Sequence, residues 1–134
     1  MIVIDSSFFV SLFVHKDVNH KKALHLWEDL RRKGIKAIAP TLLLPEVCGV
    51  IARVTKDKKY ANEVKKMMER WLKIGVLVLK ELTVKRANVS ADISINFNLK
   101  GADAIFVSLA QEFNLKFITF DKEIKRKMKN KIEV

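Results

Sequence analysis

The stretch Ile2-Val3-Ile4-Asp5 decides how this chain folds. Its first three residues are apolar and β-branched, which is typical of a short buried strand. Asp5 is the only charged residue among the first 14. A similar stretch, Phe117-Ile118-Thr119-Phe120-Asp121, lies towards the other end of the chain. Ligands of open α/β sheets bind outside the carboxyl ends of the strands. We therefore expect these two acids to share one edge of a sheet.

Short apolar segments alternate with amphipathic ones along the rest of the sequence. Strands are expected over 2–4, 37–39, 76–79 and 117–119, with 132–134 as a candidate edge strand. Helices are expected over 7–14, 20–33, 41–54, 57–73, 84–97, 102–113 and 121–129. This alternation predicts an α/β fold, a single domain over 1–134. Its sheet would be mainly parallel, with four to five strands and helices on both faces.

The third of these helices carries local signals of its own. Thr41 is a suitable N-cap, and Pro45 falls in the first turn, where a missing N–H costs least. The apolar side chains of this helix are expected to face inward, Val54 among them.

Size and cysteine content indicate a cytoplasmic globular protein. The 134 residues are 49% hydrophobic and include only 4 Gly and 2 Pro, which leaves little room for disorder. The single Cys48 has no partner for an internal disulfide and is expected to be buried in a helix. A nucleophilic role for Cys48 is the alternative, but no His lies nearby in sequence. No segment approaches the length needed to span a bilayer, so no membrane role is expected.

The charge balance favours a nucleic-acid partner. Lys and Arg number 26 against 15 Asp and Glu, a formal net charge of +11. Such an excess attracts phosphates without regard to base sequence. The alternative is a lysine-rich composition of the kind found in heat-adapted proteins. That alternative predicts a matching number of acids, which this chain lacks.

Four acidic residues stand where a parallel sheet would gather them: Asp5, Glu46, Asp103 and Asp121. Each has an ordinary explanation taken singly, as a helix N-cap, a residue favoured by the helix dipole or a solvated helix residue. However, Asp103 lies in the otherwise apolar run Gly101-Ala102-Asp103-Ala104-Ile105-Phe106-Val107. Gathered carboxylates repel one another unless a cation or protons neutralise them, so the set predicts a hard divalent metal.

At this point the chain resembles a known family, the PIN domains, and more closely the small single-domain VapC-type proteins. The resemblance covers essentially the whole chain. Four segments carry it: Val3-Ile4-Asp5-Ser6-Ser7, Pro45-Glu46-Val47, Gly101-Ala102-Asp103-Ala104-Ile105 with Ser108-Leu109-Ala110, and Phe117-Ile118-Thr119-Phe120-Asp121. The third and fourth segments are the most specific. Ser7 is a departure, because many relatives carry Asn there.

The resemblance implies a metal-dependent endoribonuclease using Mg²⁺ or Mn²⁺. Asp5, Glu46, Asp103 and Asp121 match the family's catalytic acids, with Asp5 and Asp103 as metal ligands and Asp121 as a ligand bound directly or through water. Glu46 would be a further ligand or would orient the attacking water. Ser6 and Thr119 match hydroxyl positions beside the acids, where they would hold the carboxylates.

The resemblance also implies partners. A toxin of this kind is held by a small antitoxin protein, and relatives form homodimers, which the apolar faces around Trp27 and Trp71 would support. The substrate would be RNA. Several basic clusters occur in the chain, and the one that begins after Asp121 is the first choice for the RNA backbone, with Lys122, Lys125 and Arg126 as candidates. A solvated helix face is the alternative for this cluster.

Other titratable residues fit the site less well. Asp92 is either an extra ligand or, more simply, part of a solvated helix face. The three His residues have no metal-binding spacing and are expected at the surface: His15, His20 and His25.

Two other functions compete with the nuclease. One is a non-catalytic RNA-binding or scaffold PIN module, which would have no need to keep four like charges together. The other is a phosphatase of the haloacid-dehalogenase type, which needs a second Asp where this chain has Ser7.

Overall fold

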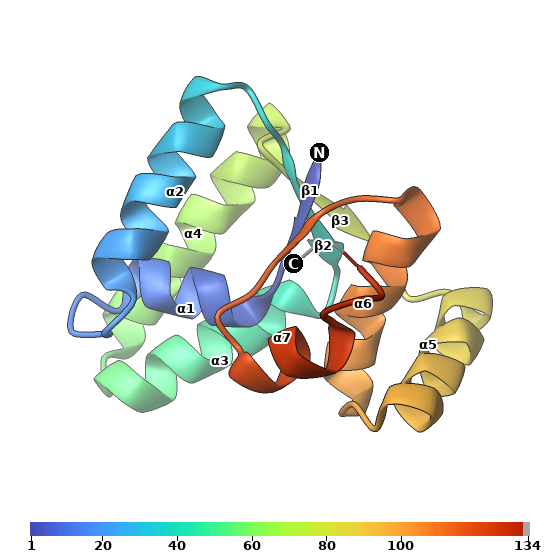
Figure 1. Cartoon of the computed structure of the whole chain (residues 1–134). Coiled ribbons are helices and arrows are strands. Elements are labelled where there is room, and N and C mark those ends of the chain that lie inside the picture. The colour runs from blue at the N-terminus through green and yellow to red at the C-terminus, as the bar shows by residue number, and fades with distance from the viewer. Residues whose placement is uncertain (133–134) are drawn as a thin grey trace.

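A four-stranded parallel sheet forms the centre of the computed structural model, which describes residues 1–132 (Figure 1). Its strands are β1 (Ile2–Ile4), β2 (Ala37–Pro40), β3 (Leu77–Lys80) and β4 (Phe117–Ile118), in the order β3-β2-β1-β4. All three neighbouring pairs are parallel. The predicted α/β fold is confirmed.

Seven helices surround this sheet within the described residues. They are α1 (Ser6–Phe13), α2 (His20–Arg32), α3 (Leu43–Thr55), α4 (Lys58–Ile74), α5 (Val84–Phe97), α6 (Gly101–Phe113) and α7 (Lys122–Met128). Figure 1 shows α1, α2 and α4 on one side of the sheet and α5 and α6 on the other. Helix α6 lies against β1 and β2, whereas α5 packs mainly on α6.

The strand order creates a switch point beside β1. The chain runs from β1 to β2 to β3 in one direction across the sheet and then places β4 on the opposite side of β1. Ile4 pairs with Ile118, so Asp5 and Thr119 are the next residues on each strand. The backbone N–H of Asp5 continues this pairing by donating to the carbonyl of Ile118 at 3.2 Å. Crevices at such switch points are the usual ligand sites of open α/β sheets.

Aromatic side chains fill the core on the α1 side of the sheet. Phe8 and Phe9 are fully buried, and Trp27 is 7% exposed. The rings of Trp27 and Trp71 pack 4.7 Å apart, and Trp71 also stacks on Phe13. Trp27 is thus covered within the chain, whereas Trp71 is only partly buried against the core. The expected dimer through the faces around these tryptophans stays a prediction.

Helix α3 differs from its sequence-based prediction in two details. Thr41 does not cap it, because the backbone N–H of Thr41 still pairs with the carbonyl of Lys80 and the helix begins at Leu43. Val54 is 58% exposed, since the buried stripe of this helix follows Leu43, Val47 and Ile51 and passes Val54 by. The first difference arises because the strand pairing delays the start of the helix, and the second because Val54 lies off the buried stripe.

Three smaller expectations can also be compared with the structure. Cys48 is half-buried rather than buried. The candidate edge strand over 132–134 falls largely outside the described residues. Each helix in the described part of the chain is too short or too polar to cross a bilayer.

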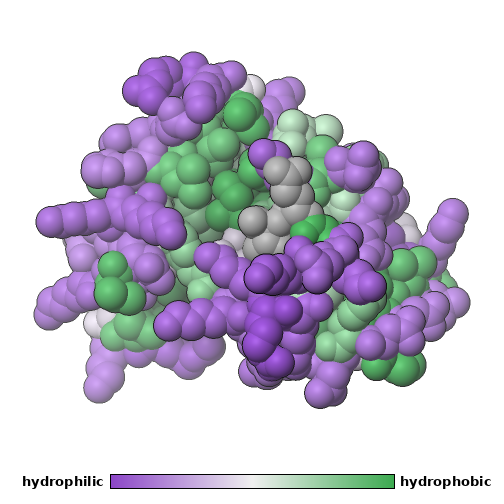
Figure 2. All heavy atoms as spheres, viewed as in Figure 1, coloured by the Kyte–Doolittle hydropathy of each residue, from purple (hydrophilic) through white to green (hydrophobic). Residues whose placement is uncertain are grey.

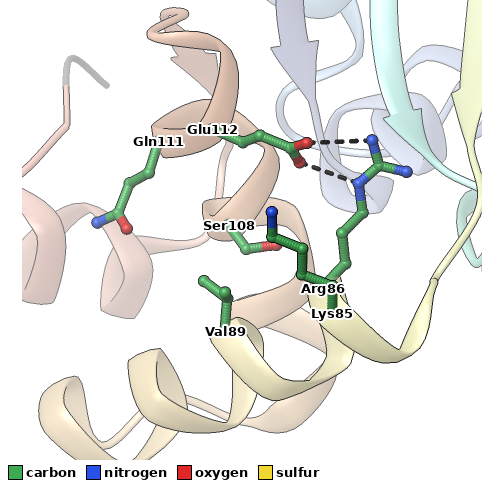
Figure 3. A pocket seen from close by; sticks show the side chains of 6 residues that line it. All are labelled: Lys85, Arg86, Val89, Ser108, Gln111 and Glu112. Atoms are coloured by element: carbon green, nitrogen blue, oxygen red, sulfur yellow. Dashed lines mark hydrogen bonds and ion pairs between the residues drawn. The ribbon is translucent and has the colours of Figure 1, made fainter.

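Arg86 joins helix α5 to α6 and to the loop before it, in addition to the packing of the two helices and the hydrogen bond from Ser90 to Ser108. Arg86 donates from Nε and Nη2 to the carboxylate of Glu112 at 2.9 and 3.2 Å, and from Nη1 to the carbonyl of Glu81 at 2.9 Å. Arg86 and Glu112 line a hollow of about 330 Å³ between α5 and α6, and Figure 3 shows the side chains around it. None of the predicted site acids lines this hollow. Arg86 thus fastens α5 to α6 on a flank away from those acids.

Replacing Arg86 with Gln is expected to loosen α5 selectively, because three hydrogen bonds that join it to α6 and to the preceding loop are removed. Amide hydrogen exchange of α5 should accelerate relative to β1 and β2, and the melting temperature should fall. Lys85→Gln, one residue away on the same helix, is the matched control. Equal exchange in the two variants would contradict the role given to Arg86.

Candidate active site

The carboxylate of Asp5 is buried at the end of the central strand. Asp5 is 5% exposed and caps α1. Its Oδ1 accepts a hydrogen bond from the Ser7 hydroxyl at 2.6 Å and a longer one from the backbone N–H of Phe8 at 3.4 Å. Its Oδ2 accepts one from the Thr119 hydroxyl at 2.5 Å. Both carboxylate oxygens are therefore oriented by neighbouring hydroxyl groups.

The two hydroxyls are themselves fixed by the segment that follows β4. The backbone N–H of Phe120 donates to Ser7 Oγ at 2.9 Å, and that of Asp121 donates to Thr119 Oγ1 at 3.0 Å. Each hydroxyl has one proton, and both protons point to Asp5. The 3.3 Å contact between the two hydroxyl oxygens then has no proton left to share. The arrangement joins the start of α1 to the start of α7 through Asp5.

Ser7 is the site residue whose role sequence reasoning missed. In the sequence it stands out only as a departure from the Asn of many relatives. A hydroxyl two residues after a buried Asp, in an otherwise apolar segment, is the signal that could have identified it. The hydroxyls of Ser7 and Thr119 hold Asp5, whereas Ser6 serves another acid.

Glu46 is linked to this group through Ser6. The Ser6 hydroxyl donates to Glu46 Oε1 at 2.7 Å. Glu46 lies in the first turn of α3, where a negative charge is favoured by the helix dipole. The hydrogen bond brings α3 to the residue next to Asp5, so the third helix supplies an acid to the same end of the sheet.

Asp103 lies in the first turn of α6 and is half-buried. Its side chain makes no hydrogen bond or ion pair with another side chain among residues 1–132. Burial, followed by the charge of Asp121, raises the pKa of Asp103, and Glu46 adds to this effect while Lys100 opposes it. Asp103 is thus the acid whose pKa is raised by the charges of two others in the set, Asp121 and Glu46.

Asp121 caps α7. Its Oδ1 accepts from the backbone N–H groups of Glu123 and Ile124 at 2.8 and 3.3 Å. Both bonds use the same oxygen, which leaves Oδ2 without a hydrogen bond from residues 1–132. A single side chain can therefore cap the helix and still present an oxygen to a cation.

The electrostatics of the group favour a proton or a cation. Burial raises the pKa of Asp5 to about 6, with a smaller contribution from Asp103, while the hydrogen bonds from Ser7 and Thr119 oppose the shift. Repulsion between carboxylates and loss of solvent both disfavour the charged forms. Oxygen ligands with this charge are those that Mg²⁺ and Mn²⁺ prefer.

The four acids share one end of the sheet but do not form a closed ligand cage. Within residues 1–132, no three His, Cys, Asp or Glu side chains converge closely enough to hold a metal ion as they stand. Asp92 is exposed on α5 and has no contact with the four acids, so the solvated-face interpretation holds for it. The His residues also lie elsewhere, with the rings of His15 and His20 packed 4.9 Å apart.

Basic side chains adjoin the acids on α7. Lys122, Lys125 and Arg126 are exposed, and Figure 2 shows hydrophilic side chains gathered over this helix. Arg126 lies 3.8 Å from Glu123. Lys127 differs from them, because its side chain is only 15% exposed and is held by protein groups.

Comparisons with known proteins agree with this architecture. A family model described as the PIN domain matches residues 2–130. VapC20 of Mycobacterium tuberculosis, a toxin that cleaves the sarcin-ricin loop, is 16% identical, with a TM-score of 0.79 over 100% of this chain and 98% of its own. A toxin–antitoxin complex from Klebsiella pneumoniae gives 18% identity and a TM-score of 0.66, covering 92% and 90% of the two chains. No curated protein sequence matches the chain.

Asp5→Asn is expected to remove the pH dependence that Asp5 gives to the stability of the metal-free protein, while it deprives one of the two hydroxyls of its acceptor oxygen. The pKa of Asp5 in the folded state, about 6, is above its ordinary value of 3.8. The folded protein therefore holds a proton on Asp5 more tightly than the unfolded chain does. The contribution of this group to the free energy of unfolding is therefore fully present below about pH 4, and it is lost as the pH rises through 6. The loss amounts to roughly 3 kcal/mol at pH 7.5. Asn also caps helices well.

Urea unfolding in EDTA at pH 4 and pH 7.5 measures this difference. Asp92→Asn, which changes an exposed acid on α5, serves as the control and should leave the pH dependence intact. A variant that is less stable than wild type at pH 7.5, by the same amount as at pH 4, would contradict the assignment.

Proposed function

Because the chain belongs to the PIN domain family, we propose that it is an endoribonuclease that hydrolyses RNA phosphodiester bonds with Mg²⁺ or Mn²⁺. The observation that carries this proposal is the gathering of Asp5, Glu46, Asp103 and Asp121 at the switch point beside β1. The coupling of Asp103 to the other three acids supports it. A group of buried and half-buried like charges is costly for a fold that makes no use of them.

The donor set fits a hard divalent cation. Asp5, Asp103 and Asp121 would hold it through carboxylate oxygens, with Glu46 as a further ligand or as the group that orients the attacking water. Such a cation, when bound, makes water a better nucleophile at neutral pH and stabilises charge on the phosphate. Asp103 and the free oxygen of Asp121 have ligand positions that no protein group occupies among residues 1–132.

The remaining residues of the site keep the acids in place. Ser7 and Thr119 direct the two oxygens of Asp5, and Ser6 directs Glu46. These three hydrogen bonds hold the carboxylates in place, although the carboxylates repel one another. The negative charge of the group also repels an RNA phosphate, so the substrate can approach closely only when that charge is neutralised.

RNA is the proposed substrate because the acids lie beside a basic helix. The chain has a net charge of +11, and α7 presents Lys122, Lys125 and Arg126 next to Asp121. Phosphates attracted by these side chains would lie close to the carboxylates.

A cytoplasmic toxin that is held by a small antitoxin is the biological role that we propose. Its support is the fold, shared with VapC20 and with a chain from a toxin–antitoxin complex. An antitoxin segment could offer a basic side chain to the four acids in place of the cation. Homodimer formation stays a prediction.

A scaffold module that binds RNA without cutting it is the second candidate. The observation that favours it is that the acids do not converge into a ready ligand cage among the described residues. A phosphatase of the haloacid-dehalogenase type has no such support, since Ser7 donates a hydrogen bond to Asp5 and supplies no second carboxylate.

Cleavage of a mixed pool of structured and single-stranded RNA tests the nuclease. Wild type is expected to cut with Mn²⁺ or Mg²⁺ and not in EDTA. Asp103→Asn should lower the rate by at least about 100-fold, because a ligand of the reacting centre is removed. Asp92→Asn, the same change on the exposed face of α5, should cut like wild type.

The result that would overturn the nuclease is equally specific. If no condition gives cleavage while wild type and Asp103→Asn bind RNA with equal affinity, the scaffold module becomes the better description. Cleavage that persists in both variants would show that the acids are not the reacting centre.

RNA binding by α7 is tested in EDTA, where no cleavage occurs. Replacing Lys122, Lys125 and Arg126 together with Gln should weaken binding and make its salt dependence shallower. The slope of log K against log[salt] should change by about 0.7 for each RNA phosphate that the variant no longer neutralises. The control removes three exposed lysines from α4: Lys58, Lys59 and Lys66. An equal change in the control would mean that RNA responds only to overall charge.

A further inference from the structure

Lys127 is a largely buried cation in the basic cluster after Asp121. Its side chain is 15% exposed, and its Nζ donates to the backbone carbonyl of Asn98 at 2.6 Å. The same Nζ lies 3.0 Å from Glu123 Oε1. This interaction is the first cause of the lowered pKa of Glu123. Lys127 therefore faces protein groups, whereas Lys125 and Arg126 beside it face solvent.

The two partners of Lys127 belong to the two segments that carry Asp103 and Asp121. Asn98 lies in the turn that leads into α6, and Asp103 is in the first turn of that helix. Glu123 is in the first turn of α7, directly after the Asp121 cap. The ammonium group thus forms a bridge between the α5–α6 turn and α7.

The acceptor carbonyl is held at a fixed position. Asn98 has a positive φ of 53°, and its own N–H donates to the carbonyl of Ser94. Ser94 in turn donates from Oγ to the carbonyl of Leu99 at 2.6 Å. Leu99 is 5% exposed. These hydrogen bonds and the burial of Leu99 hold the turn in one conformation. The hydrogen bond from Lys127 therefore connects α7 to a fixed point in the α5–α6 turn.

We propose that Lys127 is a positioning residue of the acidic site, which sets the separation of Asp103 and Asp121 by fastening the α5–α6 turn to α7. This inference rests on the proposed function, because the separation matters only if these two carboxylates share a cation. Lys127 does not touch the reacting atoms. It acts through the two segments that carry the acids.

The sign of the effect on cation affinity separates positioning from simple electrostatics. Removing a positive charge close to a cation site reduces repulsion and should strengthen cation binding. Removing a bridge that sets the ligand separation should weaken it, by about tenfold if Lys127 matters as much as other residues that orient ligands. Lys127→Met removes both the charge and the bridge, and a net loss of affinity identifies positioning as the larger effect.

The experiment titrates the metal-free protein with Mn²⁺ and measures the concentration of the free ion by electron paramagnetic resonance. Wild type, Lys127→Met, Lys127→Arg and Lys125→Met are compared. Lys125→Met, an exposed lysine on the same helix, supplies the electrostatic effect alone, so its affinity should be unchanged or slightly higher. Lys127→Met should bind about tenfold more weakly, and Lys127→Arg should recover part of the loss.

A second readout does not depend on metal. Amide hydrogen exchange at Gly101, Ala102 and Asp103 in EDTA should be faster in Lys127→Met than in Lys125→Met, while β1 stays protected. If Lys127→Met fails to fold, Lys127→Arg is compared with wild type in both measurements, and a shift in Mn²⁺ affinity without a change in melting temperature supports the proposal.

Two outcomes overturn the inference in distinguishable ways. Equal Mn²⁺ affinity and equal exchange in Lys127→Met and Lys125→Met would remove the positioning role and leave the nuclease standing. Absence of Mn²⁺ binding by wild type would instead remove the metal site, and with it both proposals.

Discussion

The burial of one carboxylate, that of Asp5, is the constraint on which the candidate site depends. A carboxylate taken out of water is stable only when its oxygens find donors. Here the donors come from Ser7, two residues further along the chain, and from Thr119 on the neighbouring strand. Parallel pairing of β1 with β4 places Thr119 there. Asp5 therefore obtains this hydrogen-bond donor only when the two strands pair in the observed register. A slip in that register would leave Asp5 without one of its two side-chain donors.

Local structure and site use the same side chains. Asp5 and Asp121 each cap the helix that follows them, and Glu46 and Asp103 lie in first turns where the helix dipole favours negative charge. Four helix starts therefore offset part of the cost of holding like charges near one another. Burial, with a smaller contribution from neighbouring carboxylates, still raises the pKa values of Asp5 and Asp103. Stability and chemistry make opposite demands on these residues.

Much of the fold could be predicted from the sequence because its signals are local. Short β-branched runs and amphipathic periods indicate strands and helices, and acids after strands indicate the edge where ligands bind. What could not be predicted depends on partners distant in the chain. Thr41 has the residue type of a cap, and its pairing with Lys80 is invisible in sequence. Ser7 and Lys127 appear as an ordinary serine and an ordinary surface lysine until β4 and the α5–α6 turn are in place. The packing of Trp27 and Trp71 could not be predicted either, because helical spacing indicates an apolar face without indicating which residues cover it.

The site has a consequence for the order in which the protein is made. Asp5 and Thr119 are 114 residues apart in the chain and meet only when the last described strand pairs with the first. Because a domain folds as a unit, the four acids come together only after the chain has been synthesised beyond Asp121. A chain interrupted before that point contains the residues of β1, β2 and β3 but only two or three of the four acids. The proposed activity would therefore be withheld from unfinished copies by topology alone.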